Sequence, residues 1–189
     1  MTTMPQLAKW KPRPELLLCP NIPKPLHCVN PRTILGQAWW NQRRQEAYRV
    51  TDFHCAACGV WKFHAKGHQW LEGHEIYRID YVRGRMYLEE VVALCSYCHE
   101  FIHSGRLQAL MEQGKITQGH FAAVIQHGNK VLRDAGLTKP EPYAGKTAPW
   151  GKWRLILNRR YYKPKYGTPE EWAAHFSGVS GEVEYKEEP

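Results

Sequence analysis

The sequence has no apolar stretch near the roughly 20 residues that a membrane-spanning helix requires. Residues 1–14 also lack the apolar core of a signal peptide. We therefore expect a cytoplasmic protein rather than a secreted or membrane protein. Because a reducing cytoplasm disfavours disulfides, the six cysteines point to metal binding or catalysis.

Acidic residues are outnumbered: 18 Asp and Glu stand against 26 Lys and Arg, and the 189-residue chain has a formal net charge of +8. Hydrophobic residues make up 43% of the chain, which excludes a disordered protein. Residues 1–50 carry eight basic and two acidic side chains, residues 51–107 six and seven, and residues 108–189 twelve and nine. The basic flanks around a nearly neutral centre favour DNA as a partner.

The stretch 142–169 contains no acidic residue, and its basic residues are interleaved with tryptophans and tyrosines. This pattern is typical of a surface that faces nucleic-acid phosphates. The alternative is a hydrophobic hairpin with a solvated charged face, and the two are compatible. The candidate phosphate contacts here and in an upstream helix are Arg43, Arg44, Arg159, Arg160, Lys163 and Lys165.

Five segments are expected along the chain. They are an extended proline-rich arm and a basic helix in 1–50, a metal-bearing core in 51–107, a helical packing segment in 108–140, a basic aromatic hairpin with a short helix in 141–176, and an acidic disordered tail in 177–189. The seven prolines of 5–31 forbid a long helix, so we expect this arm to wrap the outside of the fold.

Apolar spacing and turn residues predict the individual elements. Helices are expected over 33–48, 107–113, 118–135 and 170–176, the last with Thr168 as cap and Pro169 at its first position. A short strand pair is expected over 153–157 and 161–162.

Two CxxC pairs, Cys55 with Cys58 and Cys95 with Cys98, are separated by 36 residues. Each pair can supply two thiolates to one tetrahedral Zn²⁺. The sequence therefore predicts a structural zinc that ties two distant turns together. Two alternatives are buried cysteines without metal and a set formed by the first pair with His64 and His68. Cys19 and Cys28 are expected to be ordinary buried thiols.

Histidines gather next to the second pair. His99 and His103 lie four residues apart on one face of a predicted helix, and His99 is turned about 100° from Cys98. Upstream, the alternating segment 70–77 places Glu72 and His74 on one strand face. This spacing suits a second metal site beside the zinc. His120, His127 and His175 are expected to be packing or solvated residues, and His54, His64 and His68 surface groups or groups behind the metal ligands.

The strings LEGHEIYRIDY, GRMYLEEVVALCSYCHEFIH and SGRL resemble the zinc-containing HNH endonucleases of the ββα-metal superfamily, in a branch of phage and bacterial proteins. The strings PNIPKPLH and NPRTILGQAWW are similar to the same branch. The resemblance implies an α+β fold with a small ββα-metal core stapled by a four-cysteine zinc, flanking helices and a short C-terminal β-hairpin. It also implies location in a bacterial or phage-infected cell.

By this resemblance, His74 is the general base that activates water, His99 binds a catalytic divalent ion, and His103 is a second ligand or a phosphate contact. A near-neutral histidine suits proton abstraction, and a metal ion suits stabilisation of the leaving 3′-oxygen. Histidine and carboxylate ligands accept Mg²⁺, Mn²⁺ or Ni²⁺. The implied activity is metal-dependent hydrolysis of DNA.

The chain departs from the HNH pattern at two positions. Gly73 stands where the pattern has an acidic or histidine ligand, and Glu90 stands where it has asparagine. We expect Glu72 or Glu75 to supply the missing carboxylate and Glu90 to accept a hydrogen bond from His74. The alternative is a degenerate HNH fold that keeps its zinc and binds DNA, or a phage packaging or assembly partner, without cutting.

Overall fold

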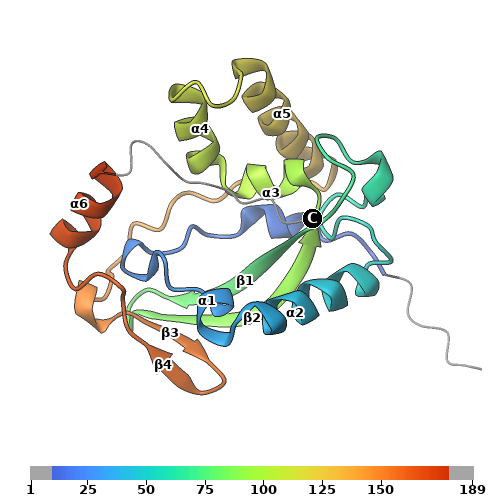
Figure 1. The fold of residues 1–189 in the computed structure, drawn as a ribbon. Coiled ribbons are helices and arrows are strands. Elements are labelled where there is room, and N and C mark those ends of the chain that lie inside the picture. The colour runs from blue at the N-terminus through green and yellow to red at the C-terminus, as the bar shows by residue number, and fades with distance from the viewer. Residues whose placement is uncertain (1–9, 179–189) are drawn as a thin grey trace, which may run out of the picture. The chain divides into compact units, whose positions relative to one another are not determined.

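The computed structural model describes residues 10–178 (Figure 1). Contacts divide the described chain into two units, each built from three stretches. The first unit contains residues 10–21, 37–76 and 89–143, and the second contains 22–36, 77–88 and 144–178. The segments expected from the sequence are continuous, whereas these units are interleaved along the chain.

The described chain is a mixed α+β fold with one four-stranded sheet and six α-helices. The strands are β1 Glu72–Asp80, β2 Arg85–Leu94, β3 Arg154–Leu157 and β4 Arg160–Tyr162. The helices are α1 Pro31–Leu35, α2 Gln37–Val50, α3 Ser96–Ile102, α4 Ser104–Glu112, α5 Gln118–Asp134 and α6 Pro169–Gly178. Four 3₁₀ turns complete the elements: η1 Pro14–Leu18, η2 Lys24–Leu26, η3 Lys62–His64 and η4 Trp150–Lys152. Between residues 10 and 178, no helix has the length and apolarity to cross a membrane.

In the first unit, α3 packs against α5, α4 and η1 (Figure 1). Helices α4 and α5 confirm the helices expected over 107–113 and 118–135. Thr117 caps α5, since its side chain accepts a hydrogen bond from the His120 amide. The close approach of α3 and α5 requires Gly128, because a Cβ there would lie 2.1 Å from the Phe101 ring.

The helix expected over 33–48 is interrupted. Gly36 has a φ of 88°, a conformation that side-chain-bearing residues rarely adopt, and it separates α1 from α2. Asn30 caps α1 by accepting a hydrogen bond from the Thr33 amide at 2.9 Å. The single-helix prediction was wrong because apolar spacing continues through a backbone break.

The proline-rich arm has no long helix, as predicted, but its expected place on the outside was wrong. Prolines at the starts of η1 and η2 favour short 3₁₀ turns there. These turns bury Leu16 and Leu17 in the core of the first unit and Leu26 in that of the second. The arm therefore contributes apolar side chains to both cores.

In the second unit, the expected C-terminal strand pair is confirmed as β3 and β4. They are joined by Asn158 and Arg159, whose φ values of 48° and 63° match a tight hairpin turn. The sequence did not reveal that β3 also pairs in parallel with β2, with Arg85 opposite Arg154. Helix α6 is confirmed with its Thr168 cap, which accepts a hydrogen bond from the Glu171 amide.

The expected acidic tail starts inside α6, and its residues 179–189 lie outside the described part of the chain. The elements β1, β2 and α3 follow one another as strand, strand and helix. This is the order expected of a ββα core, and assignment to the HNH fold stays a prediction.

Candidate functional site

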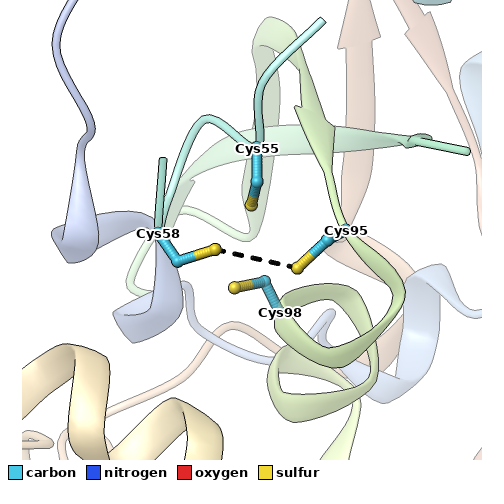
Figure 2. Close-up of side chains that lie close together, drawn as sticks. All are labelled: Cys55, Cys58, Cys95 and Cys98. Carbon is cyan, nitrogen blue, oxygen red and sulfur yellow. Dashed lines mark hydrogen bonds between the residues drawn. The ribbon is translucent and has the colours of Figure 1, made fainter. Parts of the chain in front are cut away.

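The four cysteines of the two CxxC pairs lie together, as Figure 2 shows. Cys55 and Cys58 come from the turn before η3, and Cys95 and Cys98 from the start of α3. Their sulfurs lie within 4.8 Å of one another, and the Cys58 and Cys95 sulfurs are 3.8 Å apart. In a tetrahedral site with bonds of about 2.3 Å, sulfurs are separated by about 3.8 Å. The group therefore fits Zn²⁺.

Electrostatics supports a cation at this cysteine group. Contact with Cys55 and Cys58 raises the pKa of the Cys95 and Cys98 thiols. Four thiolates so close together repel one another, and a bound divalent cation removes that repulsion while keeping all four ionised. Three of the four side chains are fully buried, which limits access of solvent to the sulfurs.

The alternative zinc site, in which His64 and His68 would join the first cysteine pair, is not formed. His68 contacts Glu72 instead, with 2.9 Å between Nε2 and Oε1, and His64 is exposed. The other two cysteines are not buried thiols as expected, since Cys19 is half-buried and Cys28 is exposed. Cys28 has a φ of 62° in the chain between η2 and α1, and a backbone that turns there carries its side chain to the surface.

His127 adds a group that the sequence did not reveal. Its Nε2 lies 3.3 Å from the Cys98 sulfur. An N–H donated to a thiolate stabilises the thiolate and fixes its orientation. His127 comes from α5, next to the Gly128 that permits close packing on α3. Its expected role in packing is confirmed, since its ring lies 5.7 Å from the Tyr97 ring. The contact with Cys98 was not predicted, and the nearest sequence signal for it is a glycine in the middle of an amphipathic helix.

His74, His99 and His103 form a second group, with one nitrogen of each within 4.8 Å of the others. His74 comes from β1 and is 7% exposed. His99 lies in α3 and His103 directly follows it. The ring centroids are 4.7–5.2 Å apart and the rings meet edge to face. The structure therefore brings together the three histidines that the sequence singled out.

Glu72 lies behind this histidine group rather than in it. One carboxylate oxygen is 2.6 Å from His99 Nδ1, and the other is 2.9 Å from His68 Nε2. Burial alone would raise the pKa of Glu72, but hydrogen bonds from His68 and His99 lower it to about 2. The ionised carboxylate holds the proton of His99 on Nδ1 and leaves Nε2 with a free lone pair. Its expected role as a direct ligand is replaced by one in orienting His99.

Two members of the histidine group, His74 and His103, are neutral at physiological pH. Burial, assisted by His99 and His103, lowers the pKa of His74 to about 3. Burial and His99 lower the pKa of His103 to about 4. A neutral imidazole has an unprotonated nitrogen that can bind a metal ion or accept a proton. Imidazole nitrogens can bind a divalent ion, and a group of at most three such donors leaves a coordination position open, which distinguishes it from the cysteine group.

The expected contact between Glu90 and His74 was wrong. Both carboxylate oxygens of Glu90 accept hydrogen bonds from Arg13, at 2.6 and 3.2 Å. The ionisable groups close enough to affect the pKa of His74 are instead His99, His103 and Glu72. The Arg13 pairing joins residues 77 apart in sequence, which no local pattern indicates. Glu75 is not in the histidine group of the described residues.

Packing explains why position 73, the other departure from the HNH pattern, is a glycine. A Cβ at this position would lie 3.0 Å from the Trp40 ring and 3.1 Å from Arg44 Cβ. Helix α2 therefore runs so close to β1 that a side chain at position 73 would require Trp40 or Arg44 to move by a few tenths of an ångström. Arg44, one of the candidate phosphate contacts, also donates a hydrogen bond from Nε to the Asn41 side chain at 3.1 Å.

The other candidate phosphate contacts are distributed over both units. Arg43 is exposed but pairs with Glu46 at 2.9 Å. The four candidates of the second unit, Arg159, Arg160, Lys163 and Lys165, are all exposed. Their contact with DNA stays a prediction.

Comparison of the chain with protein-family models, with curated proteins and with solved structures gives no match.

Proposed function

We propose that this protein is a metal-dependent endonuclease of the HNH type that hydrolyses DNA phosphodiester bonds at the histidine group. One observation carries the proposal. Three histidines converge beside a closed cysteine group, the pKa values of two of them are lowered, and a carboxylate orients the third. A metal site built only for stability would need neither the open coordination position nor a second set of ligands.

Hydrolysis of a phosphodiester requires activation of water and stabilisation of charge on the leaving oxygen. His74 accepts the proton of water on its unprotonated ring nitrogen. His99 and His103 are the ligands for a divalent cation, which when bound stabilises the negative charge on the leaving 3′-oxygen. Glu72 keeps His99 in the tautomer that points Nε2 away from the carboxylate.

The second candidate function is DNA binding without cleavage. It is favoured by the described histidine group having no carboxylate member, since Glu72 is engaged by His68 and His99 and position 73 is a glycine. In this alternative the histidine group has no catalytic activity, and the zinc only stabilises the fold. A role in a phage packaging or assembly complex belongs to the same alternative.

Plasmid cleavage separates these candidates. Supercoiled DNA is incubated with the protein and Mg²⁺, Mn²⁺ or Ni²⁺, and nicked and linear products are measured. We expect cleavage by the parent protein and a loss of about 10²- to 10⁴-fold for His74→Ala, the usual contribution of a general base. The matched control is His175→Ala, an exposed histidine outside both metal groups, which should cut like the parent.

Two results would overturn the endonuclease proposal. Equal cleavage by His74→Ala and the parent would remove His74 from the reaction. Salt-sensitive DNA binding with no product in any of the three metals would support the binding module instead.

A further inference from the structure

A loop between the first CxxC pair and β1 exposes large aromatic side chains. This aromatic loop, residues 60–71, carries Trp61, Phe63 and Trp70, with exposed fractions of 40%, 46% and 56%. Eight large hydrophobic residues are this exposed in the described chain, and three of them lie in these twelve positions. Large aromatic side chains left in solvent at one place mark an interaction surface.

The charge of the aromatic loop indicates the kind of partner. It contains Lys62, Lys66, His64 and His68 and no acidic residue. The Lys62 ammonium lies 4.7 Å from the centre of the Phe63 ring and 4.6 Å from that of Phe53. Cations interleaved with aromatic faces suit a strand of nucleic acid, whose phosphates pair with the cations while its bases stack on the rings. A hydrophobic protein partner would not need the excess of cations.

The aromatic loop is held in place at both ends. Its start is anchored by the Cys55 amide, which donates to the Val60 carbonyl, and by the Lys62 amide, which donates to Phe53. Further along, the Ser96 hydroxyl of α3 donates to the Lys66 carbonyl at 2.8 Å. Gly67 is required there, because a Cβ would lie 2.4 Å from the Ser96 oxygen. A fixed loop loses little conformational entropy when a ligand binds.

The aromatic loop also leads directly to the histidine group. His68 stacks on Trp70, with ring centroids 3.7 Å apart and an angle of 2° between the planes. The same histidine contacts Glu72, which contacts His99. A chain of three contacts therefore links an exposed tryptophan to a candidate metal ligand.

We propose that the aromatic loop binds unpaired bases that flank the scissile phosphate, so that single-stranded or branched DNA is preferred over fully paired DNA. Bases within a duplex are stacked on one another and do not offer their faces to protein side chains. The position beside a scissile phosphate rests on the proposed function. The binding itself is measured with no divalent ion added, so that it does not depend on cleavage.

The test is fluorescence anisotropy with a short labelled oligothymidine and with a duplex of equal length, at one salt concentration. Loss of one stacking side chain weakens binding by roughly 5- to 150-fold. We expect a loss in this range for Trp70→Ala and for Trp61→Ala on the single strand, and less than about twofold on the duplex. Trp70→Phe, which keeps an aromatic face, should retain most of the affinity. Phe176→Ala removes a similarly exposed aromatic side chain, outside both the loop and the stretch 142–169, and should change nothing.

Three results overturn the proposal: no measurable binding of the single strand by the parent, alanine variants that bind it like the parent, and equal losses on both DNA forms. Zinc content and melting temperature verify folding, and Trp70→Ala alone suffices if Trp61→Ala does not fold. If the binding pattern holds but no metal supports cleavage, the endonuclease proposal fails while the base-binding loop stands. If DNA is cleaved but the binding pattern is missing, the base-binding loop fails while the endonuclease proposal stands.

Discussion

The cysteine group and the histidine group lie in the same unit and share one short stretch of chain, yet their donor atoms and surroundings differ. The cysteine group has four sulfur donors, three of them on buried residues, and one of its thiols is contacted by His127. The histidine group has three nitrogen donors and a carboxylate behind one of them. Four protein ligands close a structural site, whereas fewer ligands leave a position for water or substrate.

The start of α3 explains how the two groups stay separate. Cys98 and His99 are consecutive, and consecutive helical residues point about 100° apart. Cys98 therefore joins the cysteine group while His99 joins the histidine group and meets Glu72. One helical turn can thus support a folding site and a reaction site, provided that neighbouring ligands diverge. Substitutions and metal removal can test whether the cysteine group stabilises the fold and the histidine group supports cleavage.

The largest effect is expected from breaking the cysteine group. Cys95→Ser should release zinc and unfold the protein, because apparent zinc binding energies of about 10–16 kcal/mol are coupled to folding in small sites. Metal analysis and thermal denaturation measure both consequences. Cys19→Ser is the control, since Cys19 lies outside the group. A Cys95→Ser protein that melts like the parent would mean that the cysteine group does not stabilise the fold.

Metal removal should separate the two groups without any mutation. Brief treatment with a chelator is expected to abolish plasmid cleavage, because the open histidine group releases its ion more readily than four buried thiolates do. Zinc content and melting temperature should stay unchanged, and added Mn²⁺ should restore cleavage. Cleavage that is lost only together with the zinc would contradict separate roles for the two metal groups.

A smaller effect is expected at the carboxylate behind His99. Glu72→Gln leaves the shape but removes the charge that fixes the His99 proton, so cleavage should fall about 10- to 100-fold while zinc is retained. Cleavage rates at saturating Mn²⁺ measure the change. Glu75→Gln, the neighbouring carboxylate outside the histidine group, should have little effect. The reverse ranking of these two variants would assign the orienting role to Glu75.

The smallest effect on cleavage is expected from His127→Gln. This variant should weaken zinc binding about tenfold, since it alters a contact to a ligand rather than a ligand. Competition with a coloured zinc chelator measures that affinity. Cleavage by the zinc-loaded variant should match the parent. A large loss of cleavage would show that the two groups are coupled through α3.

Local spacing predicted the parts of both groups that depend on neighbours in sequence. Two residues between cysteines place both thiols on one turn, and four residues between His99 and His103 place both rings on one helix face. Alternation along β1 placed Glu72 and His74 together. These signals are local, and the structure confirms the elements that they indicated.

Partners that depend on packing between distant elements could not be predicted. His127 reaches Cys98 only because Gly128 lets α5 approach Phe101 of α3. Glu90 is 77 residues from Arg13, and its preference for that guanidinium over His74 follows from where η1 lies. The break at Gly36 escaped detection because a permissive backbone leaves the apolar pattern unchanged.

The most direct test is anomalous diffraction from crystals grown with Mn²⁺, with data collected at the zinc and manganese absorption edges. We predict a zinc peak among Cys55, Cys58, Cys95 and Cys98, and a separate manganese peak among His74, His99 and His103. A histidine group without an anomalous peak at saturating Mn²⁺ would contradict the central claim that this chain pairs a closed structural metal site with an open reactive one.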